Sequence, residues 1–523
     1  MRWPSPVHGY LPRVDAVVSH PCEGVSSASE SRSDRPGEGS VTLEDPLDVG
    51  FVPAECPGAE GTGATRTSSL LVEELSRHHD LTVYVSSQMD AADATLPAED
   101  RVEYVLMDDL PMLPHPIKVK IDALREASDS LERHDLVHSY SSAFIPVLAD
   151  LNTRTVVTLN SYLPVCPKAD MLYRGTEKCT GPGRLKCASC IPRTALGRRQ
   201  GVSRELRATY LAYGSIPFVE RSMERAADID AFHAISPHVR RDYAALGFPD
   251  DRIKVVPHFY DEAFRSVSEG PESRIGGSES HFGGSETQIG GSGPGNGSSG
   301  PQSGSSGPQS GSSGAKNGSS GTRNGGSETR IEVSQAMAYE EPVRLLYAGT
   351  LHRMKGVHVL LEALSTLHEY GLDAELQIAG SGPYESKLER LTSQLGLDDH
   401  VEFLGYVDHE RMPSVYAAAD VFVYPGIIDE PFGRVMLEAL ATHTPVAASN
   451  VGSMDYIVGP CGELFEAGDP QALAAAVSRV LDDYEGYAAE IPAHVRGFAP
   501  DAVVASLVEL HERVAGYAPP KRV

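Results

Sequence analysis

The sequence predicts an α/β protein with two Rossmann-like domains. Two stretches of the chain alternate short apolar strands with amphipathic helices, and glycine-rich loops follow several of the strands. Strand, loop, helix and strand in that order form a βαβ unit, which implies a parallel sheet. A long Gly/Ser-rich block separates the two stretches, and 523 residues exceed what one hydrophobic core accommodates.

This pattern divides the chain into five segments. Residues 1–45 are rich in Ser, Gly, Pro, Glu and Arg without periodicity, so we expect a disordered extension. Residues 46–264 form the first α/β domain, residues 265–340 a flexible Gly/Ser linker, and residues 341–485 the second α/β domain. The last segment, residues 486–523, contains an amphipathic helix that we expect to pack back on the first domain.

The strands are predicted from short apolar runs that turn residues or helical patterns follow. The first domain opens with the strand DVGFVP, a loop containing Gly61 and Gly63, a helix, and the strand DLTVYVSS. Its other strands are expected in HDLVHSY, TRTVVTLNSY, DIDAFHAIS and RIKVVPHF. Those of the second domain are expected in PVRLLYAGTL, DAELQIAGSG, VEFLGYV, VYAAADVFVYP and PVAASN.

The composition argues against nucleic acid as a partner. Asp and Glu number 72 against 45 Lys and Arg, a net charge of −27 that repels phosphate backbones. Arginine outnumbers lysine by 35 to 10, a bias typical of proteins from a salt-rich, halophilic cytoplasm, although an ordinary acidic protein shares it. No apolar run has the roughly 18–20 residues that cross a bilayer, and the short apolar stretches near the first residues lead us to expect no signal peptide. We therefore expect a cytoplasmic protein, with peripheral membrane contact left open.

The sharpest chemical signal is a pair of carboxylates, Glu430 and Glu438, in the segment EPFGRVMLE. The segment follows the strand DVFVYP and opens a helix, and parallel sheets place ligands at such strand ends. Carboxylates accept hydrogen bonds from sugar hydroxyls, and the amides of a helix N-terminus favour an anion. The competing interpretation is that Glu430 caps the helix and Glu438 lies on its solvated face.

Two further loops of the second domain follow strands. Arg353 and Lys355 lie between a strand and an amphipathic helix, where they could neutralise a diphosphate or be ordinary surface charges. Gly380, Ser381 and Gly382 follow the strand AELQIA, where glycines let backbone approach a phosphate or form a simple turn.

Taken together, these loops resemble the group 1 (family 4) glycosyltransferases of the GT-B fold. The resemblance covers residues 48–261 and 342–515 and is strongest over residues 401–458. It implies two Rossmann-like domains that face each other across a cleft. It also implies an enzyme that moves a sugar from a nucleotide diphosphate-sugar to a glycan or lipid-linked acceptor, with retention at the anomeric carbon and no divalent metal for the chemistry.

The resemblance also implies roles for individual residues of the second domain. Glu430 would hold donor-sugar hydroxyls and Glu438 the nucleotide ribose, while Lys355 would stabilise the departing diphosphate. The remaining donor contacts would come from the backbone of Phe432 and Gly433, from Gly382 beside the phosphates, and from Tyr406 and Val407 beside the base. Family members usually carry Arg directly after the glycine where Thr350 follows Gly349 here, so Arg353 is a candidate substitute.

In the first domain, Gly61 and Gly63 match the family's glycine-rich loop near the donor phosphate. Asn160 stands where many members have a histidine near the donor sugar, and an amide cannot shuttle protons. His258 stands near the linker and is expected to be a structural residue between the domains. Thr350 and Asn160 keep an alternative open, a catalytically weak or inactive sugar-nucleotide-binding scaffold. An epimerase or a phosphorylase on the same fold is a further rival.

Four cysteines lie close together in the sequence, at positions 166, 179, 187 and 190. Their spacing favours a structural Zn²⁺ or iron–sulfur site held by Cys166, Cys179, Cys187 and Cys190, with a disulfide or free thiols as alternatives. A basic run follows in the same region, at Arg184, Lys186, Arg193, Arg198, Arg199 and Arg204. It predicts contact with an acceptor phosphate or an anionic membrane, or else a solvated helix face.

Overall fold

The computed structural model describes residues 46–58, 63–86, 96, 99–107, 116–174, 177–194, 215–265 and 342–516. All of these residues belong to one compact unit. The expected disordered extension, and the expected linker apart from Arg265, lie outside the described residues.

The first sheet has seven strands, all parallel, in the order β3-β2-β1-β4-β5-β8-β9. The strand order reverses direction between β1 and β4, which is the switch point where sheets of this kind bind ligands. The strands are β1 (Asp48–Val52), β2 (Asp80–Ser86), β3 (Val102–Met107), β4 (Leu136–Ser139), β5 (Arg154–Leu159), β8 (Ala231–Ala234) and β9 (Ile253–Val255).

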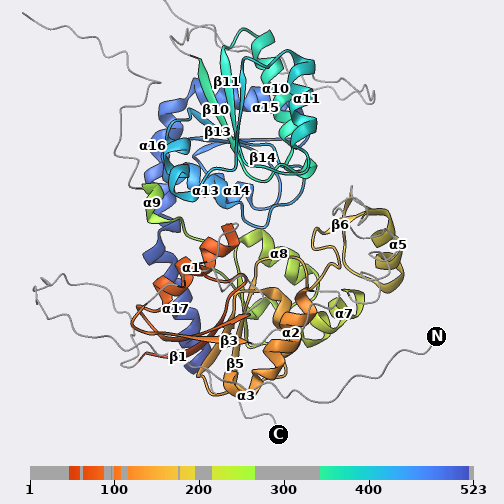
Figure 1. The fold of residues 1–523 in the computed structure, drawn as a ribbon, viewed down its shortest axis with the longest axis vertical. Coiled ribbons are helices and arrows are strands. Elements are labelled where there is room, and N and C mark those ends of the chain that lie inside the picture. Colours follow the sequence, from red (N-terminus) through yellow and green to blue (C-terminus); the bar gives the residue numbers. More distant parts are fainter. Residues whose placement is uncertain are drawn as a thin grey trace, which may run out of the picture. The chain divides into compact units, whose positions relative to one another are not determined.

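Helices cover both faces of this sheet, as Figure 1 shows. Alternation along β1 sends Val49 and Phe51 to the cluster formed with α1 and α17, and Val52 to the cluster formed with α2 and α4. The helices are α1 (Gly63–Leu75), α2 (Pro116–Glu126), α3 (Ser128–Leu131), α4 (Ile145–Leu148), α7 (Ile216–Arg225), α8 (Pro237–Ala245), α9 (Glu262–Arg265) and α17 (Pro500–Gly516).

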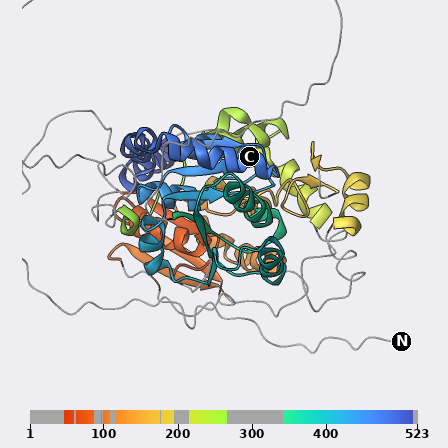
Figure 2. The same cartoon turned by 90° about the horizontal axis from the view of Figure 1, so that it is seen from above.

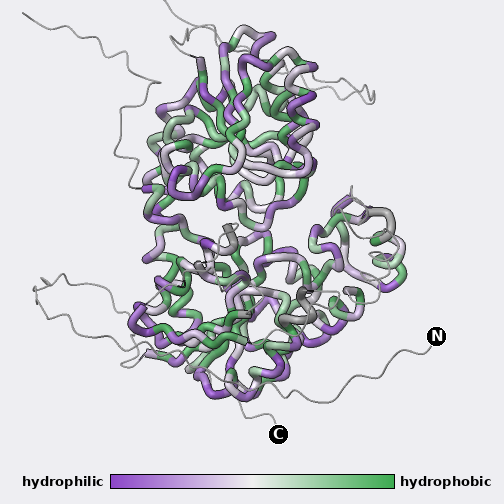
Figure 3. The backbone as a smooth tube through the Cα atoms, viewed as in Figure 1, coloured by the Kyte–Doolittle hydropathy of each residue, from purple (hydrophilic) through white to green (hydrophobic). Residues whose placement is uncertain are grey.

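The second sheet has six parallel strands in the order β12-β11-β10-β13-β14-β15, with its switch point between β10 and β13. Its strands are β10 (Val343–Ala348), β11 (Ala374–Ala379), β12 (Val401–Gly405), β13 (Val421–Tyr424), β14 (Val446–Ser449) and β15 (Gly462–Phe465). Its helices are α10 (Val357–Glu369), α11 (Glu385–Leu395), α12 (Met412–Ala417), α13 (Arg434–Ala441), α14 (Met454–Val458), α15 (Pro470–Asp482) and α16 (Tyr484–Val495). The hydrophobic stretches of the chain run through the strands of both sheets (Figure 3).

The last described helix, α17, packs against the first sheet although it follows the second sheet in sequence. Its buried residues Val503, Leu507 and Leu510 join the cluster that contains Phe51 of β1. A buried hydrogen bond of 3.0 Å also joins His511 Nε2 of α17 to His138 Nδ1 of β4. The chain therefore returns to its first domain, because the apolar face of α17 is buried there.

An insertion lies between β5 and α7, and it contains the four clustered cysteines. It has a two-stranded antiparallel sheet, β6 (Leu172–Tyr173) and β7 (Glu177–Lys178), followed by α5 (Arg184–Thr194). Figures 1 and 2 both show this insertion beside the main sheets. We call residues 166–194 the cysteine insertion.

The predicted fold class is confirmed, and the predicted strand runs contain strands of the two sheets. The sequence pattern missed one strand of each main sheet, β3 and β15, and the short strands β6 and β7 of the insertion. The apolar–polar alternation of β3 (VEYVLM) is poor, and its burial is correspondingly partial because it is the edge strand. The four-residue β15 (GELF) is too short and too polar to stand out.

Candidate active site

The predicted catalytic residues lie at the carboxyl ends of the two strands that flank the switch point of the second sheet. Lys355 ends a short 3₁₀ turn, Arg353–Lys355, after β10, and Glu430 lies in the loop after β13. The two loops are joined by a backbone hydrogen bond of 3.0 Å from Ile427 N to Met354 O. The parallel pairing of β10 with β13 thus places residues 75 positions apart at one edge of the sheet.

Lys355 and Glu430 form a close ion pair. Lys355 Nζ lies 2.6 Å from Glu430 Oε2, and the hydroxyl of Tyr424 donates to the same carboxylate oxygen at 2.8 Å. Both ionic side chains are partly exposed, so a ligand can reach them. Burial and the Glu430 charge raise the pKa of Tyr424 well above its ordinary value, which keeps it a neutral donor.

Glu438 is held inside the fold on α13. Its Oε2 accepts a hydrogen bond of 3.1 Å from Tyr416, and its Oε1 lies 3.6 Å from the guanidinium of Arg434. Only 9% of Glu438 is exposed, which excludes the interpretation of a solvated helix face. A buried carboxylate with these partners is fixed in orientation.

The start of α13 depends on a glycine. Gly433 has a φ of +90°, and a Cβ there would lie 2.1 Å from Cε of Met436. The preceding Phe432 is buried, with its ring 4.7 Å from that of His258 in a perpendicular arrangement. The turn into α13 is therefore fixed by both its backbone and its packing.

The loop after β11 packs closely against the loop after β10. A Cβ on Gly382 would lie 2.4 Å from the carbonyl oxygen of Leu351, and Leu351 N donates to Ser381 O at 2.9 Å. The residues expected beside the base follow β12, where Tyr406 is 68% exposed and Val407 is partly buried. Arg353 is exposed, and its charge adds to burial in lowering the pKa of His358.

The residues of the first domain that the sequence predicted for the site are Gly61, Gly63 and Asn160. Gly61 lies outside the described residues, and Gly63 is the first residue of α1. Asn160 follows β5, and its side-chain amide forms two hydrogen bonds with backbone atoms. Nδ2 donates to Tyr140 O at 2.9 Å, and Oδ1 accepts from Ser142 N at 3.4 Å. In this arrangement Asn160 fixes the loop after β4.

Several contacts join the first domain to the loop around Glu430, and apart from His258 and Phe432 the sequence did not single out the side chains that make them. Arg434 donates to the Thr67 hydroxyl of α1. Ser236, before α8, donates to the carbonyl of Pro431 at 2.8 Å. His258, expected to be a structural residue between the domains, accepts or donates a 2.6 Å bond with Tyr140 and packs on Phe432. No sequence signal marks these pairs, because each one joins distant segments.

The four cysteines do not form the expected metal site. Among the described residues no disulfide links them, and no three of their sulfurs lie within 4.8 Å of one another. Two of the thiols instead face local backbone: Cys179 lies 3.4 Å from Gly181 O, and Cys190 lies 3.7 Å from Leu172 O. The prediction of a Zn²⁺ or iron–sulfur cluster is therefore wrong for this arrangement, in which the cysteines are thiols outside any disulfide.

The basic run is described only in part. Arg184 forms two hydrogen bonds, of 2.6 and 2.9 Å, with Glu220 of α7, and Lys186 bonds Thr180 and Gly181. These two cations thus have partners within the fold, as the solvated-face interpretation requires. Arg198, Arg199 and Arg204 lie outside the described residues, and for Arg193 only the backbone is described.

The two parallel α/β sheets, each with its switch point, form a GT-B fold. Two family models match the chain: "Glycosyltransferase Family 4" over residues 61–264 and "Glycosyl transferases group 1" over residues 329–493. Together they cover more than half of the chain. The chain belongs to the group 1 (family 4) glycosyltransferases.

Characterised relatives match over part of their length. The D-inositol 3-phosphate glycosyltransferase of Corynebacterium urealyticum is 38% identical over 177 residues, 32% of this chain and 42% of the relative. The phosphatidyl-myo-inositol mannosyltransferase of Mycobacterium leprae is 37% identical over 167 residues, 31% of this chain and 44% of the relative. The matches thus span less than half the length of either relative.

A solved structure shares the fold over most of the chain. The Anabaena protein Alr3699/HepE, in complex with UDP and glucose, matches with a TM-score of 0.53 at 15% identity. The match covers 88% of this chain and 98% of the Anabaena chain. Among the described residues, no helix combines the length and the apolar character needed to span a bilayer.

Proposed function

We propose that the protein is a retaining glycosyltransferase that moves a sugar from a nucleotide diphosphate-sugar to a glycan or lipid-linked acceptor. The observation that carries this proposal is the 2.6 Å pair of Lys355 and Glu430 at the switch point of the second sheet. Family membership and the fold shared with a UDP-binding protein support it.

In this proposal, Lys355 and Glu430 exchange partners when the donor binds. The ammonium of Lys355 turns from the carboxylate to the diphosphate, where it stabilises the charge that develops as the bond to the sugar breaks. Glu430, still oriented by Tyr424, accepts hydrogen bonds from donor-sugar hydroxyls. The leaving phosphate takes the acceptor proton on the same face of the sugar, so the anomeric configuration is retained.

Glu438 and Tyr406 are proposed to hold the nucleotide. Glu438 is fixed by Tyr416, which leaves its other oxygen directed toward Arg434 and available to a ribose hydroxyl. The exposed ring of Tyr406 offers a face for the base. Gly382 and the amides of Phe432 and Gly433 complete the proposed donor contacts, with Arg353 as an additional cation for the phosphates.

The test is a panel of nucleotide sugars, screened first for binding by thermal shift and then for transfer. The acceptor panel includes inositol phosphate and phosphatidylinositol, since the names of two relatives point to inositol-bearing acceptors. We expect one donor to bind and to be turned over, and the product's anomeric configuration to match that of the donor by NMR.

Variants separate catalysis from binding. Lys355→Ala is expected to lower kcat/KM by about 10²–10³-fold, as the loss of one group that stabilises transition-state charge does. Lys387→Ala is the matched control, because Lys387 is a cation of the same domain that lies over the ring of Tyr384. Binding of a donor without turnover on any acceptor would contradict the proposal and favour the alternative of a sugar-nucleotide-binding scaffold.

A further inference from the structure

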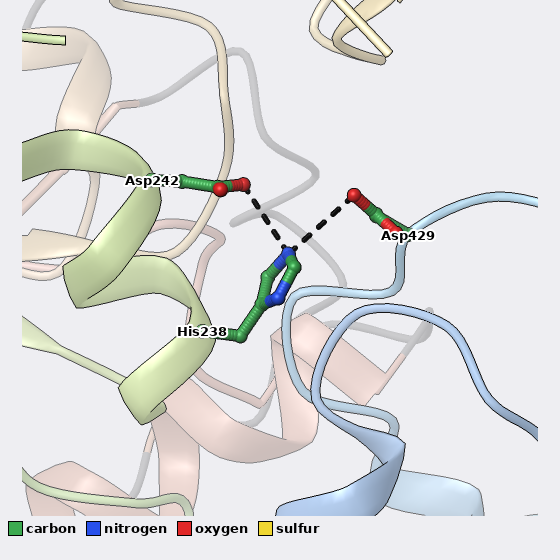
Figure 4. Close-up of side chains that lie close together, drawn as sticks. All are labelled: His238, Asp242 and Asp429. Atoms are coloured by element: carbon green, nitrogen blue, oxygen red, sulfur yellow. Dashed lines mark ion pairs between the residues drawn. The ribbon is translucent and has the colours of Figure 1, made fainter. Parts of the chain in front are cut away.

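A network of four charged side chains lies directly beside Glu430. Lys178 of the cysteine insertion lies 2.8 Å from Asp429 Oδ2 and 3.0 Å from Asp242 Oδ1. His238 Nε2 of α8 lies 3.2 Å from Asp242 Oδ2 and 3.5 Å from Asp429 Oδ2 (Figure 4). Tyr162 donates to Asp242 at 2.7 Å. Two separate segments of the first domain, the cysteine insertion and α8, thus meet one carboxylate of the second domain.

The chain itself balances the charge of this network. Burial alone would lower the pKa of His238, but its contacts with Asp242 and Asp429 raise that pKa to about 9. His238 lowers the pKa of Asp429 most strongly, and Lys178 lowers it further. Two cations therefore face two carboxylates at neutral pH. His238, Asp242 and Asp429 also have the spacing of a metal site, but the Lys178 ammonium already satisfies both carboxylates, so we assign no metal.

The loop on either side of Glu430 is fixed as well. Pro431 O accepts from Ser236 of the first domain at 2.8 Å and from Ser453 at 2.6 Å. Asp429 Oδ1 accepts from Gly452 N at 3.1 Å, while Glu430 O accepts from Ser453 N at 3.1 Å. Glu430 is thus the residue between two contacts with the first domain, one at Asp429 and one at Pro431.

We propose that Asp429 is a positioning residue, and that Lys178 and His238 hold it so that Glu430 keeps its carboxylate directed at the donor sugar. We call residues 426–433 the donor loop. The cysteine insertion then connects the first domain to the donor loop through the ion pair of Lys178 with Asp429. This inference rests on the proposed function for its effect on the donor, but the contacts themselves exist without one.

Each variant removes one charged group of the network. Asp429→Asn removes the accepting charge, and Lys178→Met and His238→Gln each remove one cation. Lys178→Arg keeps the charge and is the rescue variant. Lys186→Met is the matched control, because it removes a lysine of the same insertion that bonds Thr180 and Gly181 and does not contact Asp429.

Two readouts are measured on the full-length protein. The first is hydrogen–deuterium exchange of the donor loop without any ligand, which measures how far the network restrains local opening of that loop. The second is donor affinity and the split between KM and kcat, for the nucleotide sugar found by the panel. We expect faster exchange and a roughly tenfold rise in the donor KM for Asp429→Asn and Lys178→Met, as for the loss of one charge-assisted hydrogen bond.

A pH profile distinguishes this role from a merely structural one. Wild-type donor affinity should fall as pH rises through about 9, because His238 then loses its proton and the network loses one cation. The groups that face this histidine are Asp242, Asp429 and Lys178. His238→Gln should have the lower affinity already at neutral pH and show no fall near pH 9.

The two proposals fail separately. If the wild type binds no nucleotide sugar but Lys178→Met still loosens the donor loop while Lys178→Arg and Lys186→Met do not, the proposed function is overturned and the network stands. If a donor binds, and the variants leave exchange, KM and the pH profile at wild-type values, the positioning role is overturned and the proposed function stands. Slower transfer with unchanged exchange of the donor loop would also overturn the positioning role.

Discussion

His79 should make the protein sensitive to mild acid. It lies between α1 and β2, only 2% of it is exposed, and neither ring nitrogen has a hydrogen-bond partner among the described residues. Its ring lies 5.2 Å from that of His511 on α17. Burial, with a smaller contribution from the adjacent His78, lowers its pKa from 6.5 to about 4. Protonation is therefore easier in the unfolded chain than in the folded one.

The sign and size of the effect follow from linkage. A lowered folded-state pKa means that the unfolded chain binds the proton first, so stability is full above pH 6.5 and falls as the pH drops toward 4. For a shift from 6.5 to about 4, the loss between pH 7.5 and pH 5 is about 2 kcal/mol. Carboxylates with lowered pKa values, such as Asp261, titrate below this window and contribute little to it.

The perturbation is His79→Leu, which removes the titrating ring and fills a similar volume. Urea unfolding followed by circular dichroism at pH 7.5 and pH 5 should show near-equal stability at pH 7.5. At pH 5 the variant should be more stable than the wild type by about 2 kcal/mol. His238, with its raised pKa, titrates in the opposite sense, but it is present in both proteins and cancels.

The matched control is His78→Leu, at an exposed neighbouring position, which should keep the wild-type loss of stability in acid. Equal acid loss in His79→Leu and the wild type would refute the reasoning. So would a wild type whose stability is unchanged between pH 7.5 and pH 5.

Three further predictions concern single contacts. Tyr416→Phe should weaken donor binding and cost about 1–3 kcal/mol of unfolding free energy, because it removes the hydrogen bond that the buried Glu438 carboxylate accepts from Tyr416. Denaturation and donor titration check this. Gly433→Ala should destabilise the protein by about 1–3 kcal/mol and reduce transfer, since its φ of +90° and the nearby Met436 disfavour a side chain; wild-type stability would contradict it. Leu507→Ala on α17 should cost about 2–5 kcal/mol in urea unfolding, and a cost under 1 kcal/mol would show that α17 is not part of the core.

The sequence was sufficient where the signal is local. Apolar runs such as those of β1 and β10 predicted buried parallel strands, because a strand covered on both faces needs continuous apolar residues. Glycines and charges placed directly after such strands predicted a ligand site at those strand ends, and that site stays a prediction. The expected proximity of Lys355 and Glu430 agrees with their 2.6 Å contact, although their roles in catalysis stay predictions.

The cysteine spacing shows the limit of a local signal. Sequence spacing alone brought Cys166, Cys179, Cys187 and Cys190 together as a metal site, but spacing does not fix the direction of a side chain. In the fold Cys179 and Cys190 face local backbone carbonyls, and no three of the four sulfurs lie within 4.8 Å of one another. Edge strands such as β3 were missed for a related reason, since partial burial weakens the pattern that marks a strand.

Only the tertiary structure decided which distant residues meet. Asp429 and Lys178 are 251 positions apart, and no pattern within either segment predicts a 2.8 Å ion pair between them. The same holds for His511 and His138, 373 positions apart, whose bond depends on α17 returning to the first sheet. The period and composition of neighbouring residues determine the strands and loops. The packing of whole helices and strands determines these pairs, because each segment of sequence contains only one of the two residues in contact.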